Sequence, residues 1–187
     1  MWQEALNSAM VAWSSAIDSV GWVDIGFCLC YLLCSWLCYV SGYAARENAE
    51  PWRDWMWGCG LLVMLGLDSI VQAELPALEF IRSIARAQGA YTNRRETQFL
   101  VLCAVLLVCI LIFAWMRTRL TDTWALRGPA MLGMCVLVLL ALTRFVSFHY
   151  TDAILNAHVI GIPVERLAEL TGLGLVFVGT TRWLRTR

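Results

Sequence analysis

The sequence contains no lysine and little charge of either sign. All 14 basic residues are arginine, 14 residues are acidic, and charged residues make up 15% of the 187 residues. A soluble domain is about 25% charged and about 45–50% apolar, whereas 60% of this chain is hydrophobic. A soluble fold of this length cannot bury so much apolar surface, so the composition predicts a membrane protein. The formal net charge of zero creates no field that attracts nucleic acid, and we expect no such partner.

Common catalytic and cofactor motifs are also missing. The sequence has no glycine-rich phosphate loop and no G-x-S-x-G, H-E-x-x-H or C-x-x-C-H motif. Its eight cysteines form no C-x-x-C pair and lie in apolar runs. Cys30, Cys34 and Cys38 share one helix face, where we expect them to pack as small apolar residues. The sequence therefore identifies no reaction.

Long apolar runs predict an all-α fold, a polytopic transmembrane helix bundle that forms a single membrane domain over residues 1–187. A membrane helix needs about 20 residues, and about five segments qualify, at residues 22–44, 55–71, 98–116, 129–148 and 164–183. The last segment is the weakest, because Glu165, Arg166 and Glu169 crowd its first turns. If it does not cross, the chain has four spans.

Two further segments are too polar to cross but repeat apolar residues at helical spacing. One is residues 1–20, and the other lies within residues 72–97 and ends at Gly89. We expect both to be amphipathic helices in the membrane interface, with docking on the bundle as the alternative for the first.

Arginine and tryptophan positions predict the orientation. With the N-terminus outside and the C-terminus in the cytoplasm, eight arginines fall inside and six outside. Tryptophans at the inner ends of the spans resemble an aromatic belt, namely Trp52, Trp55, Trp57, Trp115, Trp124 and Trp183. Trp36 lies deep in the first span instead. Its indole N–H needs a partner there, so we expect Trp36 to face another helix, a lipid or a bound cofactor.

Polar residues gather at the outer ends of the predicted spans. A charge within a span costs about 2.5–3.5 kcal/mol on insertion scales, so such groups pair or line a wet cavity. Asp68 and Arg144 lie about one turn from the outer ends of their helices, and we expect them to pair. His149 and Asp152 share a helix face at i, i+3, and His158 follows nine residues after His149.

This outer cluster has three interpretations. The favoured one is an ion-pair network that ties the helices together. In the second, His149, His158 and Asp152, with Asp68 or Glu74, hold a metal ion that activates water. In the third, a histidine binds a pigment or another ligand.

Four arginines in the central polar segment suggest a lipid contact. They are Arg82, Arg86, Arg94 and Arg95. Their guanidinium groups match phosphate oxygens, so they either hold a lipid phosphate or anchor an amphipathic helix to headgroups.

Two stretches resemble a family of small bacterial inner-membrane proteins without an established activity. The first is the R-x-x-A-R-x-x-G-x-Y-x-x-R-R-x-x-Q pattern from Arg82 to Gln98, and the second is R-x-x-S-x-H-x-x-D from Arg144 to Asp152. The segment around Asp68 departs from the family pattern. The resemblance implies a multi-pass protein of the bacterial inner membrane and no mechanism.

Two functional hypotheses follow. The small size and the lack of a soluble domain or catalytic motif favour an accessory or scaffolding subunit of a larger membrane complex. A pigment-binding or electron-transfer assembly is a plausible host, with Trp36 and His149 as contacts. The alternative is a membrane-embedded metal-dependent hydrolase or lipid-modifying enzyme, with His149, Asp152, Asp68 and Arg144 as catalytic candidates. Its partners in either case include membrane lipids.

Overall fold

The structure is a computed structural model, and it describes most of the chain outside its central region. The described ranges are residues 2–18, 20–72, 124–146, 157–159 and 161–187, with single residues at 76, 79, 80, 103, 104, 106, 107, 110, 111, 113, 114 and 118. The elements in these ranges are α1 (Trp2–Asp18), α2 (Trp22–Glu47), α3 (Arg53–Val71), α6 (Trp124–Val146), β1 (His158–Val159), β2 (Ile162–Pro163) and α8 (Val164–Arg185). The chain is mostly helical, which confirms the all-α prediction.

Three helices of the described chain are long and apolar enough to cross a membrane. They are α2, α3 and residues Leu126–Arg144 of α6, and they correspond to three of the five predicted spans. The helix α8 is 22 residues long but carries charges in its first turns, so its composition alone does not mark it as a span. The predicted count of about five spans remains a prediction.

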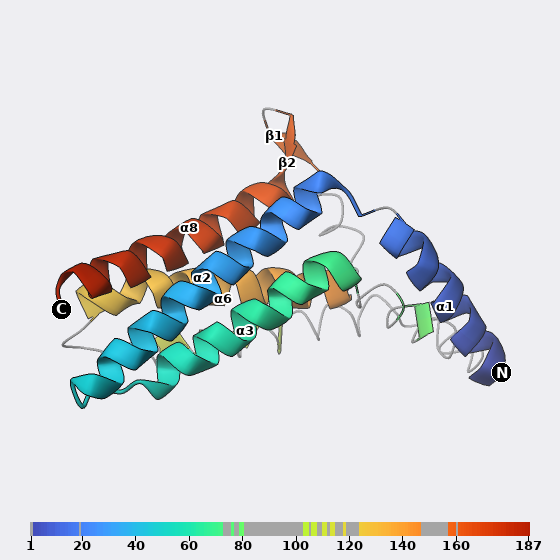
Figure 1. Cartoon of the computed structure of the whole chain (residues 1–187). Coiled ribbons are helices and arrows are strands. Elements are labelled where there is room, and N and C mark those ends of the chain that lie inside the picture. The colour runs from blue at the N-terminus through green and yellow to red at the C-terminus, as the bar shows by residue number, and fades with distance from the viewer. Residues whose placement is uncertain are drawn as a thin grey trace.

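The helices α2, α3, α6 and α8 form a bundle in which α2 packs against α3, and α6 packs against α8 (Figure 1). The helix α8 also contacts α2. The end of α2 and the beginnings of α3 and α6 meet the end of α8 at one end of the bundle, which we call the Arg127 end (Figure 1). The opposite end, where α2 and α8 begin, is called the Arg144 end.

The hydrophobic core lies where α2 meets the other helices. Phe27 and Cys38 of α2 belong to it, together with Leu62, Leu137 and Val176 of the neighbouring helices. Cys34 is also buried in this core, whereas Cys30 is exposed. The expected packing role therefore holds for two of the three cysteines on this face.

Glycines allow the closest helix contacts. A Cβ atom on Gly133 of α6 would lie 2.8 Å from the backbone nitrogen of Val176 in α8. A Cβ atom on Gly66 of α3 would lie 2.9 Å from the Cβ of Tyr31 in α2. In contrast, a Cβ atom on Gly174 would meet nothing within 4 Å. Small residues at these contacts let the backbones approach, as is typical of membrane helix pairs.

Two local features differ from the sequence prediction. Pro129 was expected to open the fourth span, but α6 begins at Trp124 and includes this proline. In the second turn of a helix a proline removes one backbone hydrogen bond and crowds the carbonyl four residues before it, but α6 continues through Pro129. The structure also contains a short antiparallel hairpin before α8, in which His158 pairs with Pro163. Gly161 in its turn has φ = +79°, a conformation that glycine adopts without strain.

The helix α1 runs across the Arg144 end of the bundle and not alongside the other helices (Figure 1). The indole N–H of Trp13 donates a hydrogen bond to the carbonyl oxygen of Val71, the last residue of α3, at 2.9 Å. Leu6, Met10 and Ile17 are exposed. The apolar face of α1 is therefore not buried against the described part of the bundle.

Only scattered residues of the central region are described. Pro76, Glu79 and Phe80, within the predicted interfacial helix, are helical. The described residues within the predicted span 98–116 are also helical, and most of them are exposed. The four arginines predicted to contact lipid, Arg82, Arg86, Arg94 and Arg95, lie outside the described residues.

Candidate functional site

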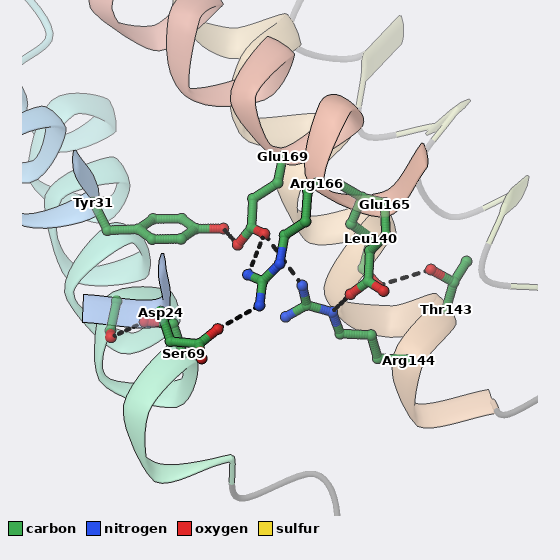
Figure 2. Close-up of polar contacts among 10 residues, drawn as sticks. Asp24, Tyr31, Ser69, Leu140, Thr143, Arg144, Glu165, Arg166 and Glu169 are labelled. Atoms are coloured by element: carbon green, nitrogen blue, oxygen red, sulfur yellow. Dashed lines mark hydrogen bonds and ion pairs between the residues drawn. The ribbon is translucent and has the colours of Figure 1, made fainter. Parts of the chain in front are cut away.

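Six polar side chains from three helices converge at the Arg144 end, and we call them the Arg144 cluster (Figure 2). The helix α2 contributes two of them, α6 contributes one, and α8 contributes three from its first two turns. They are Asp24, Tyr31, Arg144, Glu165, Arg166 and Glu169.

Glu169 is the centre of this cluster and is only 1% exposed. The hydroxyl of Tyr31 donates a hydrogen bond to its Oε1 at 2.8 Å. Its Oε2 accepts a hydrogen bond from Nη1 of Arg166 at 3.1 Å and another from Nη2 of Arg144 at 3.4 Å. One buried carboxylate thus links α2, α6 and α8.

Each arginine of the cluster also contacts a second carboxylate. Nε of Arg144 lies 2.5 Å from Oε1 of Glu165. Nη2 of Arg166 forms an ion pair with Oδ1 of Asp24, while Oδ2 of Asp24 accepts the backbone N–H of Gly21 at 3.0 Å. Asp24 therefore caps the start of α2 and binds α8 at the same time.

The charged groups of the Arg144 cluster pair with one another. Its three carboxylates and two guanidinium groups leave a formal charge of −1, and the pairing lowers the cost of placing these charges between helices. The guanidinium of Arg166 also lies 4.7 Å from the ring centroid of Phe27, a cation–π contact. These ion pairs join α2, α6 and α8, as in the interpretation of the outer cluster as an ion-pair network.

The structure gives different positions to the residues predicted for a site. Arg144 pairs with carboxylates of α8, and its predicted pairing with Asp68 remains a prediction. His149 and Asp152 lie outside the described residues. His158 is exposed in β1. The described residues include no group of three or more histidine, cysteine or acidic side chains placed to hold a metal ion, so the metal hypothesis remains a prediction that depends on undescribed residues.

A second charged cluster, which the sequence did not indicate, lies at the Arg127 end. The side chain of Arg127 is 1% exposed. Its Nη2 lies 2.5 Å from Oε2 of Glu50, and its Nη1 donates to the carbonyl oxygen of Pro51 at 3.4 Å. Arg187 forms an ion pair with the same Glu50. These contacts join the α2–α3 turn to α6 and to the end of α8.

Two tryptophans enclose the guanidinium of Arg127. Its central carbon lies 5.8 Å from the ring centroid of Trp55 and 5.4 Å from that of Trp183. Both tryptophan side chains are completely buried, so the expectation that they face the headgroups as part of a belt is wrong. Trp57, two positions along α3 from Trp55, is exposed as expected. Span ends can be recognised in a sequence, but the rotation of each helix about its axis cannot.

Three buried N–H donors of the Arg127 end have no hydrogen-bond acceptor in the described part of the chain. They are Nε of Arg127 and the indole nitrogens of Trp55 and Trp183. The cation lies near the two indole rings, whose centroids are 5.5 Å apart. Cation–π attraction lowers the cost of burying the guanidinium, but it supplies no acceptor for the two indole N–H groups.

Trp36 lies on the outside of the bundle. It is 62% exposed and stacks on Tyr39 with ring centroids 5.8 Å apart. Leu29, Leu33 and Tyr43 are exposed at helical spacing from it. We call these five residues the α2 outer face.

Comparisons with known protein families, characterised proteins and solved structures found no match. The resemblance to small bacterial inner-membrane proteins therefore remains a prediction. The interpretation of the site depends on the geometry of this chain alone.

Proposed function

We propose that this chain is an accessory or scaffolding subunit of a larger membrane complex, and that the α2 outer face binds a transmembrane helix of its partner. The observation that carries the proposal is Trp36. Its indole N–H lies on an exposed surface near the middle of α2 and has no acceptor in the described part of the chain.

The depth of Trp36 favours a protein partner over lipid tails. Tryptophan and tyrosine in membrane helices concentrate at the two interfaces. Trp36 follows the start of α2 at Trp22 by 14 residues, which is about 21 Å along a helix. An unpaired N–H in hydrocarbon costs free energy. A partner helix with a carbonyl or hydroxyl group at this depth removes the cost.

The two charged clusters support a scaffolding role. Glu169 and Arg127 are both almost completely buried; Glu169 pairs with Arg144 of α6, and Arg127 pairs with Glu50 of the α2–α3 turn. Such contacts fix the positions of the helices and leave the α2 outer face rigid for binding.

The proposed topology has five spans. The helix α8 runs beside α6 over most of its length, and its buried charges are paired, so it crosses with α6. The helix α3 ends at the Arg144 end, whereas α6 begins at the Arg127 end (Figure 1). A five-span topology needs one more crossing between these two helices, and we propose the predicted span 98–116 for it.

The arginine distribution supports the proposed orientation. Among the described residues, six arginines belong to the Arg127 end, namely Arg46, Arg53, Arg127, Arg182, Arg185 and Arg187. Two belong to the Arg144 end, Arg144 and Arg166. The positive-inside rule then assigns the Arg127 end to the cytoplasm and the N-terminus to the outside of a bacterial inner membrane.

Site-specific photo-crosslinking tests the partner interface. A benzophenone amino acid replaces Leu33, an exposed neighbour of Trp36 on the α2 outer face, so that Trp36 is retained, and the matched control carries it at Met64, an exposed position on α3. We expect one membrane protein to crosslink at position 33 and not at 64. The same protein should co-purify stoichiometrically in mild detergent, and Trp36→Leu should abolish its co-purification.

Three results would overturn the proposal. They are equal crosslinking at both positions, crosslinking only to a second copy of the chain, and purification of a stable monomer without a partner. Visible absorbance in the purified complex that is lost in Trp36→Leu would identify the host as pigment-binding.

A further inference from the structure

We infer that α1 is an interfacial helix that inserts into loosely packed lipid of low negative charge on the Arg144 side of the membrane. The inference rests on the proposed topology. It adds a second contact surface, with lipid as its occupant, to the protein-binding face on α2.

The attachment of α1 sets its depth. Only residues 19–21 separate it from Trp22, the first residue of α2. The hydrogen bond from Trp13 to Val71 joins it to the last residue of α3. The beginning of one span and the end of another mark the membrane boundary, so α1 is held at that boundary. Its crosswise direction relative to the bundle (Figure 1) is the direction of a helix lying in the membrane plane.

One face of α1 is apolar and exposed. Leu6, Met10, Trp13 and Ile17 follow the i, i+4, i+7, i+11 spacing of a single helix face. All four are exposed, and Met10 is the most exposed of them at 58%. At the membrane boundary, the surface that can cover this face along its length is the lipid beside the bundle.

The opposite face has almost no charge. Ser8 and Ser15 are exposed polar residues on it. The only charged residues of α1 are Glu4 and Asp18, both acidic. Attraction to anionic headgroups needs basic residues, so insertion of α1 depends on apolar side chains entering gaps between lipids. Anionic lipid should oppose it.

Spin labels placed on the two faces test this inference. A ketone-bearing amino acid at position 10 or 15 accepts a nitroxide and avoids the native cysteines. The full chain is reconstituted into dioleoyl phosphatidylcholine vesicles, either small and highly curved or large and extruded. Power-saturation measurements compare collisions with oxygen, which enters lipid, and with a water-soluble nickel complex.

We expect the label at Met10 to favour oxygen and the label at Ser15 to favour the nickel complex. The inserted population should be several-fold larger in small vesicles than in large ones, and phosphatidylglycerol should lower it. Met10→Asp, with the label at Ile17, should abolish insertion, whereas the matched Ser15→Asp should not.

Other results would overturn the inference. Insertion that increases with phosphatidylglycerol would contradict the charge argument. A label at Met10 exposed to water in every vesicle would mean that α1 does not insert. A label there that neither reagent reaches would mean that protein covers the face. Crosslinking at position 33 in the same samples separates these results from failure of the proposed function, because that interface does not involve α1.

Discussion

The ion pair between Arg166 and Asp24 offers a direct test of the Arg144 cluster. Replacing Arg166 with Met removes the cation and keeps most of the side-chain volume. Asp24 is 13% exposed and has no other cation in contact within the described chain. Removing one partner of a buried pair costs about 3–5 kcal/mol. Because Arg166 is 28% exposed, we expect a smaller loss, about 2–4 kcal/mol, in the free energy of unfolding.

A double-mutant cycle isolates this pair from the rest of the cluster. Asp24→Asn retains an oxygen for the N–H of Gly21 and leaves Arg166 with Glu169, so it should cost about 1 kcal/mol. In the double variant position 24 carries an amide instead of a carboxylate, so no buried negative charge is left there without a cation. Its loss should therefore be smaller than the sum of the two single losses by about 1–2 kcal/mol.

Reversible unfolding in mixed detergent micelles, followed by circular dichroism, measures these free energies. The control is Arg185→Met at an exposed position, which should change stability by less than about 0.5 kcal/mol. Additive losses for Arg166→Met and Asp24→Asn, within about 0.5 kcal/mol, would refute the view that the two helices are joined by this pair.

Three further predictions use the same bundle. Gly133→Ala should lower the free energy of unfolding by about 1–3 kcal/mol, because the added Cβ meets the α8 backbone. The control Gly174→Ala should leave the free energy of unfolding unchanged or raise it by up to about 1 kcal/mol. Unfolding in detergent compares the two variants. Arg127→Lys should cost about 2 kcal/mol in the same assay, because an ammonium group does not reproduce the stacking or the forked contacts of the guanidinium; a loss below about 0.5 kcal/mol would contradict this role. A short epitope inserted at Gly161 should be accessible to antibody in spheroplasts, which lack the outer membrane barrier, and one appended after Arg187 only after the inner membrane is permeabilised. The same accessibility for both would mean that α8 does not cross.

The sequence predicted the helices better than their contacts. Segment 164–183 was expected and α8 covers Val164–Arg185, because Gly161 and Pro163 mark the boundary before it although charges follow in its first turns. Pro129 was misleading, since a proline is compatible with either the start or the early turns of a helix. The hairpin was missed because its two-residue strands are too short to show alternation.

The depth of the polar residues was predictable, but their partners were not. Charges near the ends of apolar runs indicated a polar cluster. The assignment of Arg144 to Glu165 and Glu169 depends on α6 and α8 being neighbours, and one sequence does not contain that information. The same limit explains the Arg127 cluster, because Trp55 and Trp57 look equivalent until the rotation of α3 is known.

The central position of Glu169 has a consequence for how the protein is made. In the proposed topology, the first turns of α8 bring three charges into the membrane region, and each charge opposes insertion by a translocon when it is alone. Their partners belong to helices synthesised earlier, and Asp24 precedes Arg166 by 142 residues. Insertion of α8 is therefore a late step that depends on α2 and α6 already being in the bilayer. Loss of Asp24 should consequently impair biogenesis, by leaving α8 at the membrane surface for proteolysis, in addition to weakening the finished fold.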